Sequence, residues 1–365
     1  MDKIIDLSPT SCLQCGAQVG EEERVGKPLR FQQMEIPPIK PIVTEYRAYR
    51  ARCSCGQLIE RAKPQKEQTW CTGPRLMAII ASLSSRYRLS RDETANILSD
   101  LLGVKISPGT VQAACERTSQ ALAPAVDELA KALPQQSRIG LDETGWKQKG
   151  ERRWLWVASA PLFSLFSIHK RRGRQQLEEW GLSDFRGIAT MDRWSAYSFF
   201  PVQHRQLCWA HLHRDLKGIV DREPENKKAK AILGGMKKVF RFWRKFRSGE
   251  LDRVGLQNSV KPFRKSLKKR GLSHDFLRYW SAVFHFVDQE DVEPTNNHSE
   301  RAIRPAVLWR RGSFGSRSDA GSQFVSRLLT VAATCRKQKR SLLGWLESAL
   351  SARAVGLPPP SLLPV

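Results

Sequence analysis

The spacing of apolar residues changes twice along this chain, and that change limits its fold more than any other feature. Apolar residues recur at helical spacing between residues 72 and 121, form short continuous runs between 136 and 208, and return to helical spacing after 209. The middle part predicts three strands, a short helix over 175–180 and two further strands; the strands are 138–142, 154–158, 162–168, 187–192 and 204–208. Strands in this order, with helices before and after them, indicate an α/β fold.

Residues 1–70 contain two closely spaced cysteine pairs, each followed by a glycine that lets backbone amides turn toward the sulfur atoms. Without a secretory signal, such pairs more often bind metal than form disulfides. We interpret this segment as a zinc ribbon in which four thiolates bind Zn²⁺, and unrelated free cysteines are the alternative. An alternating piece over 43–49 resembles an edge strand, and Cys71 is a candidate substitute ligand. The four expected ligands are Cys12, Cys15, Cys53 and Cys55.

Residues 71–135 predict a helical region with three helices. Pro74 begins the first helix, Ser90 and Glu93 form a capping box for the second, and the third runs from Ser107 to Arg117. Short helices joined by a glycine-bearing turn suggest a helix-turn-helix that binds DNA. Any small helical bundle has similar spacing, so that alternative stays open.

The charge of the chain favours a polyanionic partner. Lys and Arg number 61 against 36 Asp and Glu, which gives a net charge of +25, and nucleic acid is the first candidate. Residues 221–290 alone hold 18 basic and 8 acidic residues; their basic face either meets phosphate or is merely solvated. Aromatic residues between them, such as Phe240 and Trp243, are interpreted as helix core rather than base-stacking platforms.

No apolar run is long enough for a membrane span, and the N-terminus does not resemble a signal peptide. We therefore expect a soluble, cytoplasmic protein, associated with the nucleoid and without a membrane partner. At the other end, helices are expected around 296–304, 320–337 and 342–353, and the Pro-rich tail over 351–365 is expected to be disordered.

Two of the predicted strands end in an acid. Asp142 and Asp192 follow apolar runs, and Glu300 lies in a predicted helix further on. Three carboxylates of this kind suit Mg²⁺ or Mn²⁺ rather than zinc, and such ions support phosphoryl transfer. Spacing alone does not bring the three together, because Asp142 can serve as a strand-end turn residue and Glu300 can pair with Arg304.

Four motifs in order resemble the insertion sequence 66 family of bacterial transposases. Gly140–Trp146 (GLDETGW) is similar to the family's first acidic motif, and Asp192–Tyr197 (DRWSAY) to the second. Cys208–Asp215 (CWAHLHRD) resembles a block just after it, and Pro294–Pro305, continued by Gly312–Ser316, resembles the third acidic motif. The cysteine pairs and the helices over 73–117 match the family's zinc-binding and helical regions, so the resemblance covers about residues 12–350.

The resemblance implies a ribonuclease H-like catalytic core over 136–350, with a helical insertion at about 209–290, preceded by the zinc ribbon and the helix-turn-helix-like region. It implies that Asp142, Asp192 and Glu300 are a metal-binding DDE triad. The implied activity is cleavage at the ends of an insertion sequence, followed by attack of the freed 3′ hydroxyl on target DNA. The partners would be the terminal inverted repeats and target DNA, with the protein acting as a homo-oligomer, and accessory proteins of the same element remain an open question.

Basic residues near the motifs are candidates for DNA contact. Arg301 and Arg304, next to Glu300, can hold a phosphate through paired hydrogen bonds or can pair with nearby acids. The other candidates are Arg310, Arg311, Lys170, Arg171 and Arg172. Cys208 and His211 lie on one side of a predicted helix; a packing or DNA-proximal role is preferred, since zinc would need two further ligands.

Two other functions compete with an active transposase. One is a non-catalytic DNA-binding regulator or end-binding protein derived from a transposase. The other is a structure-selective nuclease with the same core but without strand joining.

Overall fold

The computed structural model describes residues 3–61, 69–269 and 279–363, in two compact units, Met1–Lys40 and Pro41–Val365. Parts of the expected zinc ribbon (62–68), helical insertion (270–278) and tail (364–365) lie outside the described residues. The first unit has a 3-10 helix, η1 (Glu21–Glu23), and a bridge between Ser11 and Gln18. The second unit begins with a short antiparallel pair, β1 (Ala51–Arg52) and β2 (Leu58–Ile59).

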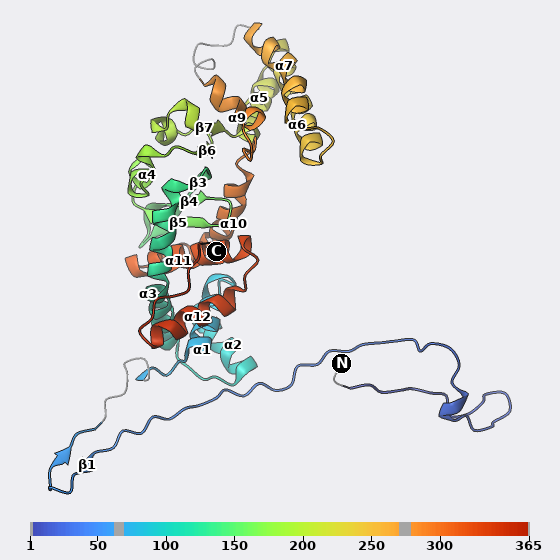
Figure 1. Ribbon diagram of the computed structural model, residues 1–365, viewed down its shortest axis with the longest axis vertical. Helices are drawn as coiled ribbons and strands as arrows, with labels where there is room; N and C mark the ends of the chain where they lie inside the picture. Colours follow the sequence, from blue (N-terminus) through green and yellow to red (C-terminus); the bar gives the residue numbers. More distant parts are fainter. Residues whose placement is uncertain (1–2, 62–68, 270–278, 364–365) are drawn as a thin grey trace. The chain divides into compact units, whose positions relative to one another are not determined.

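A five-stranded mixed sheet lies at the centre of the second unit (Figure 1). Its strands are β3 (Arg138–Gln148), β4 (Glu151–Ser159), β5 (Ser164–His169), β6 (Ile188–Met191) and β7 (Arg205–Leu207), in the order β5-β4-β3-β6-β7. The first three strands in sequence are antiparallel, whereas β6 and β7 run parallel to β3. All five predicted strands are therefore confirmed, and the fold is α/β.

Strand β3 extends six residues beyond its predicted end because its second half forms a hairpin with β4. The two residues of the connecting turn, Lys149 and Gly150, both have positive φ angles, of 51° and 81°. Two such residues make the tight turn whose twist matches the twist of the paired strands. The hairpin carries Asp142 in the middle of a long paired strand rather than at its end.

Three helices precede the sheet: α1 (Pro74–Ser85), α2 (Arg91–Leu102) and α3 (Pro108–Ala132). The capping box at α2 is confirmed, since the Ser90 hydroxyl accepts from the Glu93 amide while the Glu93 carboxylate accepts from the Ser90 amide. Helix α3 continues far past its predicted end at Arg117, because Ala121, Leu122, Ala125 and Leu129 maintain its buried stripe.

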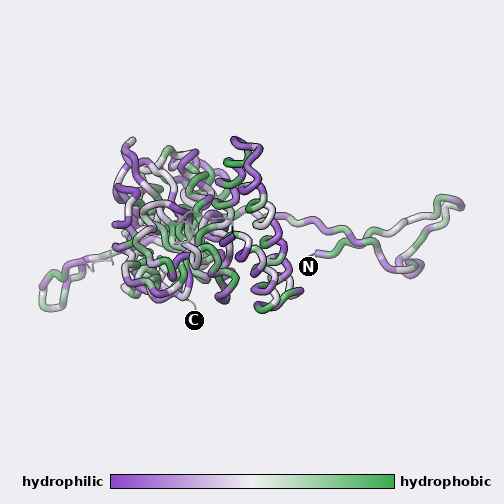
Figure 2. Tube along the Cα trace, turned by 90° about the horizontal axis from the view of Figure 1, so that it is seen from above, coloured by the Kyte–Doolittle hydropathy of each residue, from purple (hydrophilic) through white to green (hydrophobic). Residues whose placement is uncertain are grey.

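These helices share one hydrophobic core with the sheet and with the helices α11 (Asp319–Lys337) and α12 (Leu342–Ala354). Helix α11 packs on β5 and α3, and α12 packs on α1. Thr330 and Thr334 of α11 accept hydrogen bonds from the backbone amides of Phe166 and Ser164, so the outer strand β5 has a covered edge. Figure 2 shows hydrophobic residues gathered in the interior of this unit.

The segment between β7 and the helix α10 (Asn297–Ser313) forms a second hydrophobic cluster, around Trp209. Its helices are α5 (Trp209–Arg222), α6 (Lys227–Arg247), α7 (Arg253–Lys269) and α9 (Trp280–Asp288). Phe240 and Trp243 pack against this cluster, which confirms their interpretation as helix core. The remaining short elements are α4 (Gln175–Glu179) and the 3-10 helices η3 (Leu133–Gln135), η4 (Leu182–Asp184), η5 (Ser195–Phe199) and η6 (Val202–His204).

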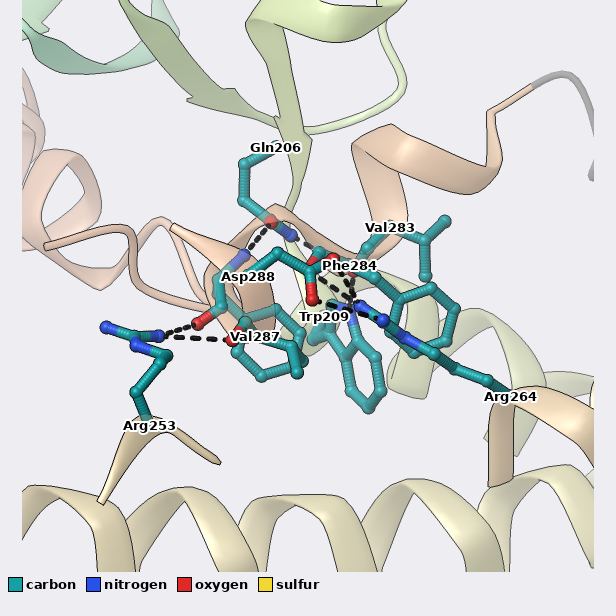
Figure 3. A network of polar contacts seen from close by, with 9 residues as sticks. Gln206, Trp209, Arg253, Arg264, Val283, Phe284, Val287 and Asp288 are labelled. Carbon is teal, nitrogen blue, oxygen red and sulfur yellow. Dashed lines mark hydrogen bonds and ion pairs between the residues drawn. The ribbon is translucent and has the colours of Figure 1, made fainter. Parts of the chain in front are cut away.

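A polar network ties this cluster to the sheet (Figure 3). The side-chain amide of Gln206 in β7 donates to the Val283 carbonyl and accepts from the Phe286 amide, and the Trp209 indole donates to the same Val283 carbonyl. Backbone groups within α9 thereby find partners on β7 and α5. The insertion is consequently fixed to the edge of the sheet from which it departs.

Two expectations fail. The edge strand predicted over 43–49 is wrong: these residues are exposed and pair with no strand among the described residues, and an alternating pattern needs a partner to become a strand. The C-terminal segment, expected to be disordered, instead returns to the core, where Leu362 is fully buried and Ser361 donates to Glu128. A segment stays disordered when it cannot bury enough apolar surface. Here the apolar residues after the prolines bury enough to order the segment.

Within the ranges that the structure describes, every helix is too short or too polar to cross a lipid bilayer.

Candidate active site

The register of the central strands brings two acids level with each other. Strand β3 pairs with β6 so that Arg138 lies opposite Ile188 and Gly140 opposite Thr190. Continued for two residues, past the end of β6 at Met191, this register puts Asp142 level with Asp192. Both carboxylates accept a hydrogen bond from a nearby backbone amide, Asp142 from Glu143 at 2.9 Å and Asp192 from Trp194 at 2.8 Å. These local bonds fix the orientation of each carboxylate.

Glu300 reaches the same region because α10 begins against β3. The buried side chain of Asn296, just before the helix, donates to the Leu141 carbonyl at 2.6 Å. At the neighbouring Gly140, an added Cβ would collide with Ser299 and lie 2.7 Å from the Asn296 side-chain oxygen. Only glycine therefore permits this approach of helix to strand, which places Glu300, in the first turn of α10, beside the two aspartates.

The pKa of Asp142 reflects its burial and its acidic neighbours. Burial, the largest cause, together with the negative charges of Glu143, Glu300 and Asp192, raises the pKa of Asp142 to about 7. A bound cation stabilises carboxylates that lie close together, and an all-oxygen ligand set suits a hard divalent ion. The residues present therefore fit Mg²⁺ or Mn²⁺.

A fourth acid, which the sequence analysis did not single out, lies directly beside the three. The Glu143 side chain is only 2% exposed and forms an ion pair with Arg172 at 2.6 Å, and it also accepts from the Tyr197 hydroxyl. The Arg172 guanidinium lies over the rings of Trp194, at 3.8 Å, and Trp154, at 4.7 Å. In the sequence, Glu143 is marked only by its position immediately after Asp142.

The candidate DNA-binding residues fall into two groups. Arg172 points inward to Glu143, and Arg310 donates to the Thr144 hydroxyl at 3.2 Å and to the Gly145 carbonyl. The others are exposed: Lys170 and Arg171 after β5, and Arg301, Arg304 and Arg311 on α10. A cavity of about 520 Å³ next to β3 is lined mainly by cationic and aromatic side chains, among them Lys147, Arg152, Arg310, Arg311 and Phe314.

The two cysteine pairs each form a tight turn within their own unit. The Gly16 amide donates to the Cys12 carbonyl, and the Gly56 amide donates to the Cys53 carbonyl, with both glycines at positive φ. Hydrogen bonds from the backbone and side chain of the following cysteine lower the pKa of the Cys12 and Cys53 thiols. Cys12 and Cys15 belong to the first unit and Cys53 and Cys55 to the second, so the four-thiolate site stays a prediction.

A mixed cluster lies on the other side of Glu300. Cys208 precedes α5 and His211 lies in its first turn. Their ligand atoms and a Glu300 carboxylate oxygen are all within 4.8 Å of one another. Interaction with the adjacent Cys208 sulfur is the main cause that raises the pKa of His211. The spacing of Cys208 and His211 is visible in the sequence, but their third neighbour is contributed by another helix.

Comparison with known proteins bears directly on this arrangement. The family model described as "Transposase IS66 family" matches residues 70–324, which include all three acids. Uncharacterized protein y4qI of Sinorhizobium fredii (strain NBRC 101917 / NGR234) is 24% identical over 393 residues, covering 90% of this chain and 69% of that protein. Uncharacterized protein y4jD of the same strain is 22% identical over 396 residues, covering 96% and 76% respectively.

Proposed function

The chain belongs to the IS66 family of transposases, and from this premise we propose that it cleaves DNA at insertion-sequence ends and joins the freed 3′ hydroxyl strand to target DNA. Membership in the family implies a DNA partner and the use of a divalent metal. We propose Asp142, Asp192 and Glu300 as the catalytic residues that hold that metal. The observation that carries the proposal is geometric: β3 and β6 are adjacent parallel strands, and Asn296 and Ser299 bring the first turn of α10, with Glu300, against β3.

The topology supports a ribonuclease H-like core. Three antiparallel strands are followed by two parallel ones, and the sheet order is β5-β4-β3-β6-β7. Such a core is expected to carry acids on two adjacent central strands and on a helix that packs against them, and this chain has that arrangement around β3. A helical insertion between the second and third acids also matches the expectation. We propose residues 136–350 as this catalytic core.

In the proposed mechanism, the chain supplies a rigid set of oxygen ligands. Asp142 and Asp192 are oriented by backbone amides, and Glu300 is positioned by the contact of Asn296 with β3. A divalent ion bound there would activate an attacking oxygen and stabilise the leaving oxygen of phosphoryl transfer. Fixed ligands reduce the reorganisation needed when charge develops on the phosphate.

Contact with DNA would use the exposed cations around this site. The cavity lined by Lys147, Arg152 and Arg311 lies beside the strand that carries Asp142. Arginine and lysine side chains around a cavity are suited to phosphate oxygens, and phosphate contacts hold a duplex in place without reading its sequence. Helices α6 and α7 add further exposed basic residues, such as Lys237 and Arg244 on α6 and Lys261 on α7.

At the N-terminal cysteine pairs we propose a structural Zn²⁺ site. The support is local: both pairs form turns that lower the pKa of their first thiol, and thiolates are the form that binds zinc.

The test is cleavage and joining on a plasmid that carries the DNA flanking the gene, with purified protein and Mg²⁺. Wild type should yield joined products, Asp192→Asn should yield none, and a matched exposed control, Asp127→Asn in α3, should behave as wild type. Wild-type protein that binds the ends specifically but leaves them intact would overturn the proposal in favour of a non-catalytic regulator. Nicks without joined products would instead identify a nuclease.

A further inference from the structure

We propose that Cys208, His211 and Glu300 form a second metal site, which binds a zinc-class transition ion through sulfur, nitrogen and oxygen. The three ligand atoms lie within 4.8 Å of one another, and Nδ1 of His211 is 3.7 Å from Oε1 of Glu300. Tetrahedral zinc with ordinary bond lengths holds its ligand atoms about 3.3–3.6 Å apart. The side chains therefore need only small movements to close around an ion.

Unmet hydrogen-bonding capacity points to the same place. Nδ1 of His211 and Oε1 of Glu300 are both buried atoms, and their ion-pair distance of 3.7 Å is too long for a hydrogen bond. Neither atom has a hydrogen-bond partner among the residues that the structure describes. Buried polar atoms nearly always have one, so a further group is expected here. A cation satisfies both at once, since both can act as lone-pair donors.

The cysteine is already in a setting that suits a ligand. Its sulfur accepts a hydrogen bond from the Asn296 backbone amide at 3.2 Å, and Cys208 is only 1% exposed. Donors to a ligating sulfur orient it and stabilise its negative charge. The Cys208 sulfur thus has an outer hydrogen-bond partner in the structure as it stands.

The backbone around the cluster is held from several sides. The Cys208 amide donates to the Met191 carbonyl at 2.8 Å, and the Trp209 amide donates to the Pro294 carbonyl at 2.7 Å. These bonds join the start of α5 both to β6 and to the segment that leads into α10. Cys208 at the N-terminal end of α5, His211 within α5 and Glu300 on α10 are therefore held in position without a metal.

The ligand types decide which ion fits. Thiolate and imidazole favour zinc-class ions over Mg²⁺, whereas the aspartates offer only oxygen. Three protein ligands leave a fourth position for water, and the His211 and Glu300 side chains are 29% and 37% exposed, which gives that water access. A carboxylate has two oxygens, so Glu300 can contribute Oε1 here and its other oxygen to the triad. The inference rests on the geometry of the cluster and not on the proposed catalytic function.

The experiment is a Co²⁺ titration of the full-length chain, followed by thiolate-to-cobalt absorption in the near ultraviolet. The background variant removes the thiols of the expected zinc ribbon, with serine at Cys12, Cys15, Cys53 and Cys55. We expect one equivalent of Co²⁺ to produce the band and Zn²⁺ to displace it. Adding Cys208→Ser should abolish the band, whereas the control Cys335→Ser, at another buried cysteine, should leave it unchanged.

Because Cys208 is buried and its replacement can disturb folding, His211→Ala provides a second variant at a partly exposed position. Loss of this ligand should weaken Co²⁺ binding by at least about tenfold while the circular dichroism spectrum stays that of the background protein. Absence of the band in the background variant, or a band that survives Cys208→Ser, would show that His211 and Glu300 form only an ion pair. Neither outcome depends on DNA cleavage, so the site can fail while the proposed function stands.

Discussion

Replacing the buried Glu143 by glutamine tests how the residues around the triad are held together. The substitution keeps the shape of the side chain but removes the negative charge that faces Arg172 at 2.6 Å. Removing one partner of a fully buried ion pair costs about 3–5 kcal/mol. Because the Arg172 side chain is 29% exposed and also lies against Trp194, we lower that figure to about 2–3 kcal/mol for Glu143→Gln.

The cost of burying two charges determines what a second substitution should do. Glu143→Gln alone leaves the Arg172 charge without its partner. Removing both charges leaves neither group to be desolvated, so the second substitution should restore part of the stability. We expect Glu143→Gln combined with Arg172→Met to be more stable than the sum of the two single variants predicts, by at least about 1 kcal/mol.

Urea unfolding of the four proteins in this double-mutant cycle measures the coupling. The matched control is Arg174→Met, which breaks an exposed pair with Glu178 and should change the free energy of unfolding by less than about 0.5 kcal/mol. Additive effects of the two substitutions, or a Glu143→Gln variant as stable as wild type, would refute the reasoning.

Four other predictions concern the rest of the chain. Serine at both Cys12 and Cys15 should lower the bound zinc by one equivalent, measured by metal analysis, and equal zinc content would refute the zinc ribbon. Leu362→Ala should lower the free energy of unfolding by about 2–3 kcal/mol because a fully buried side chain is lost, whereas the exposed Leu357→Ala should have no effect in the same urea titration. Burial lowers the pKa of Lys337 from 10.5 to about 8, so between pH 8 and 10.5 this side chain is protonated in the unfolded chain but not in the folded one. The free energy of unfolding should therefore rise with pH over this range more steeply in wild type than in Lys337→Met. Parallel plots of the free energy of unfolding against pH for the two proteins would contradict this. DNA affinity, measured by fluorescence anisotropy, should fall by about a thousandfold or more between roughly 50 and 200 mM salt, and a flat response would mean that the positive charge serves another purpose.

The strands and most helices could be predicted because their signals are local. An apolar run bounded by turn residues predicted 187–192, where β6 occupies Ile188–Met191, and a capping box marked the start of α2. The failures depend on partners distant in sequence. An alternating pattern over 43–49 found no strand to pair with, and the C-terminal segment is ordered because Leu362 enters a core built from other elements.

The site shows the same division. The positions of the acids could be assigned from motifs, whereas the pairing of β3 with β6, which sets the two aspartates on neighbouring strands, was seen only in the structure. Glu143 and Gly140 could not be assigned in advance, since their importance comes from contacts with Arg172 and Asn296, both far along the chain. A residue's role that depends on contacts distant in sequence cannot be predicted from the local spacing of apolar residues.

The long separation between Asp192 and Glu300 in the chain is closed beside β6. The insertion departs at Cys208 and Trp209, and the chain returns at Pro294 to accept a hydrogen bond from the Trp209 amide, while the Asn296 amide donates to the Cys208 sulfur. The two ends of the insertion are therefore bonded to each other beside β6. Because its entry and exit are joined, the insertion can carry its own hydrophobic core and basic surface without displacing the helix that presents Glu300 to the aspartates.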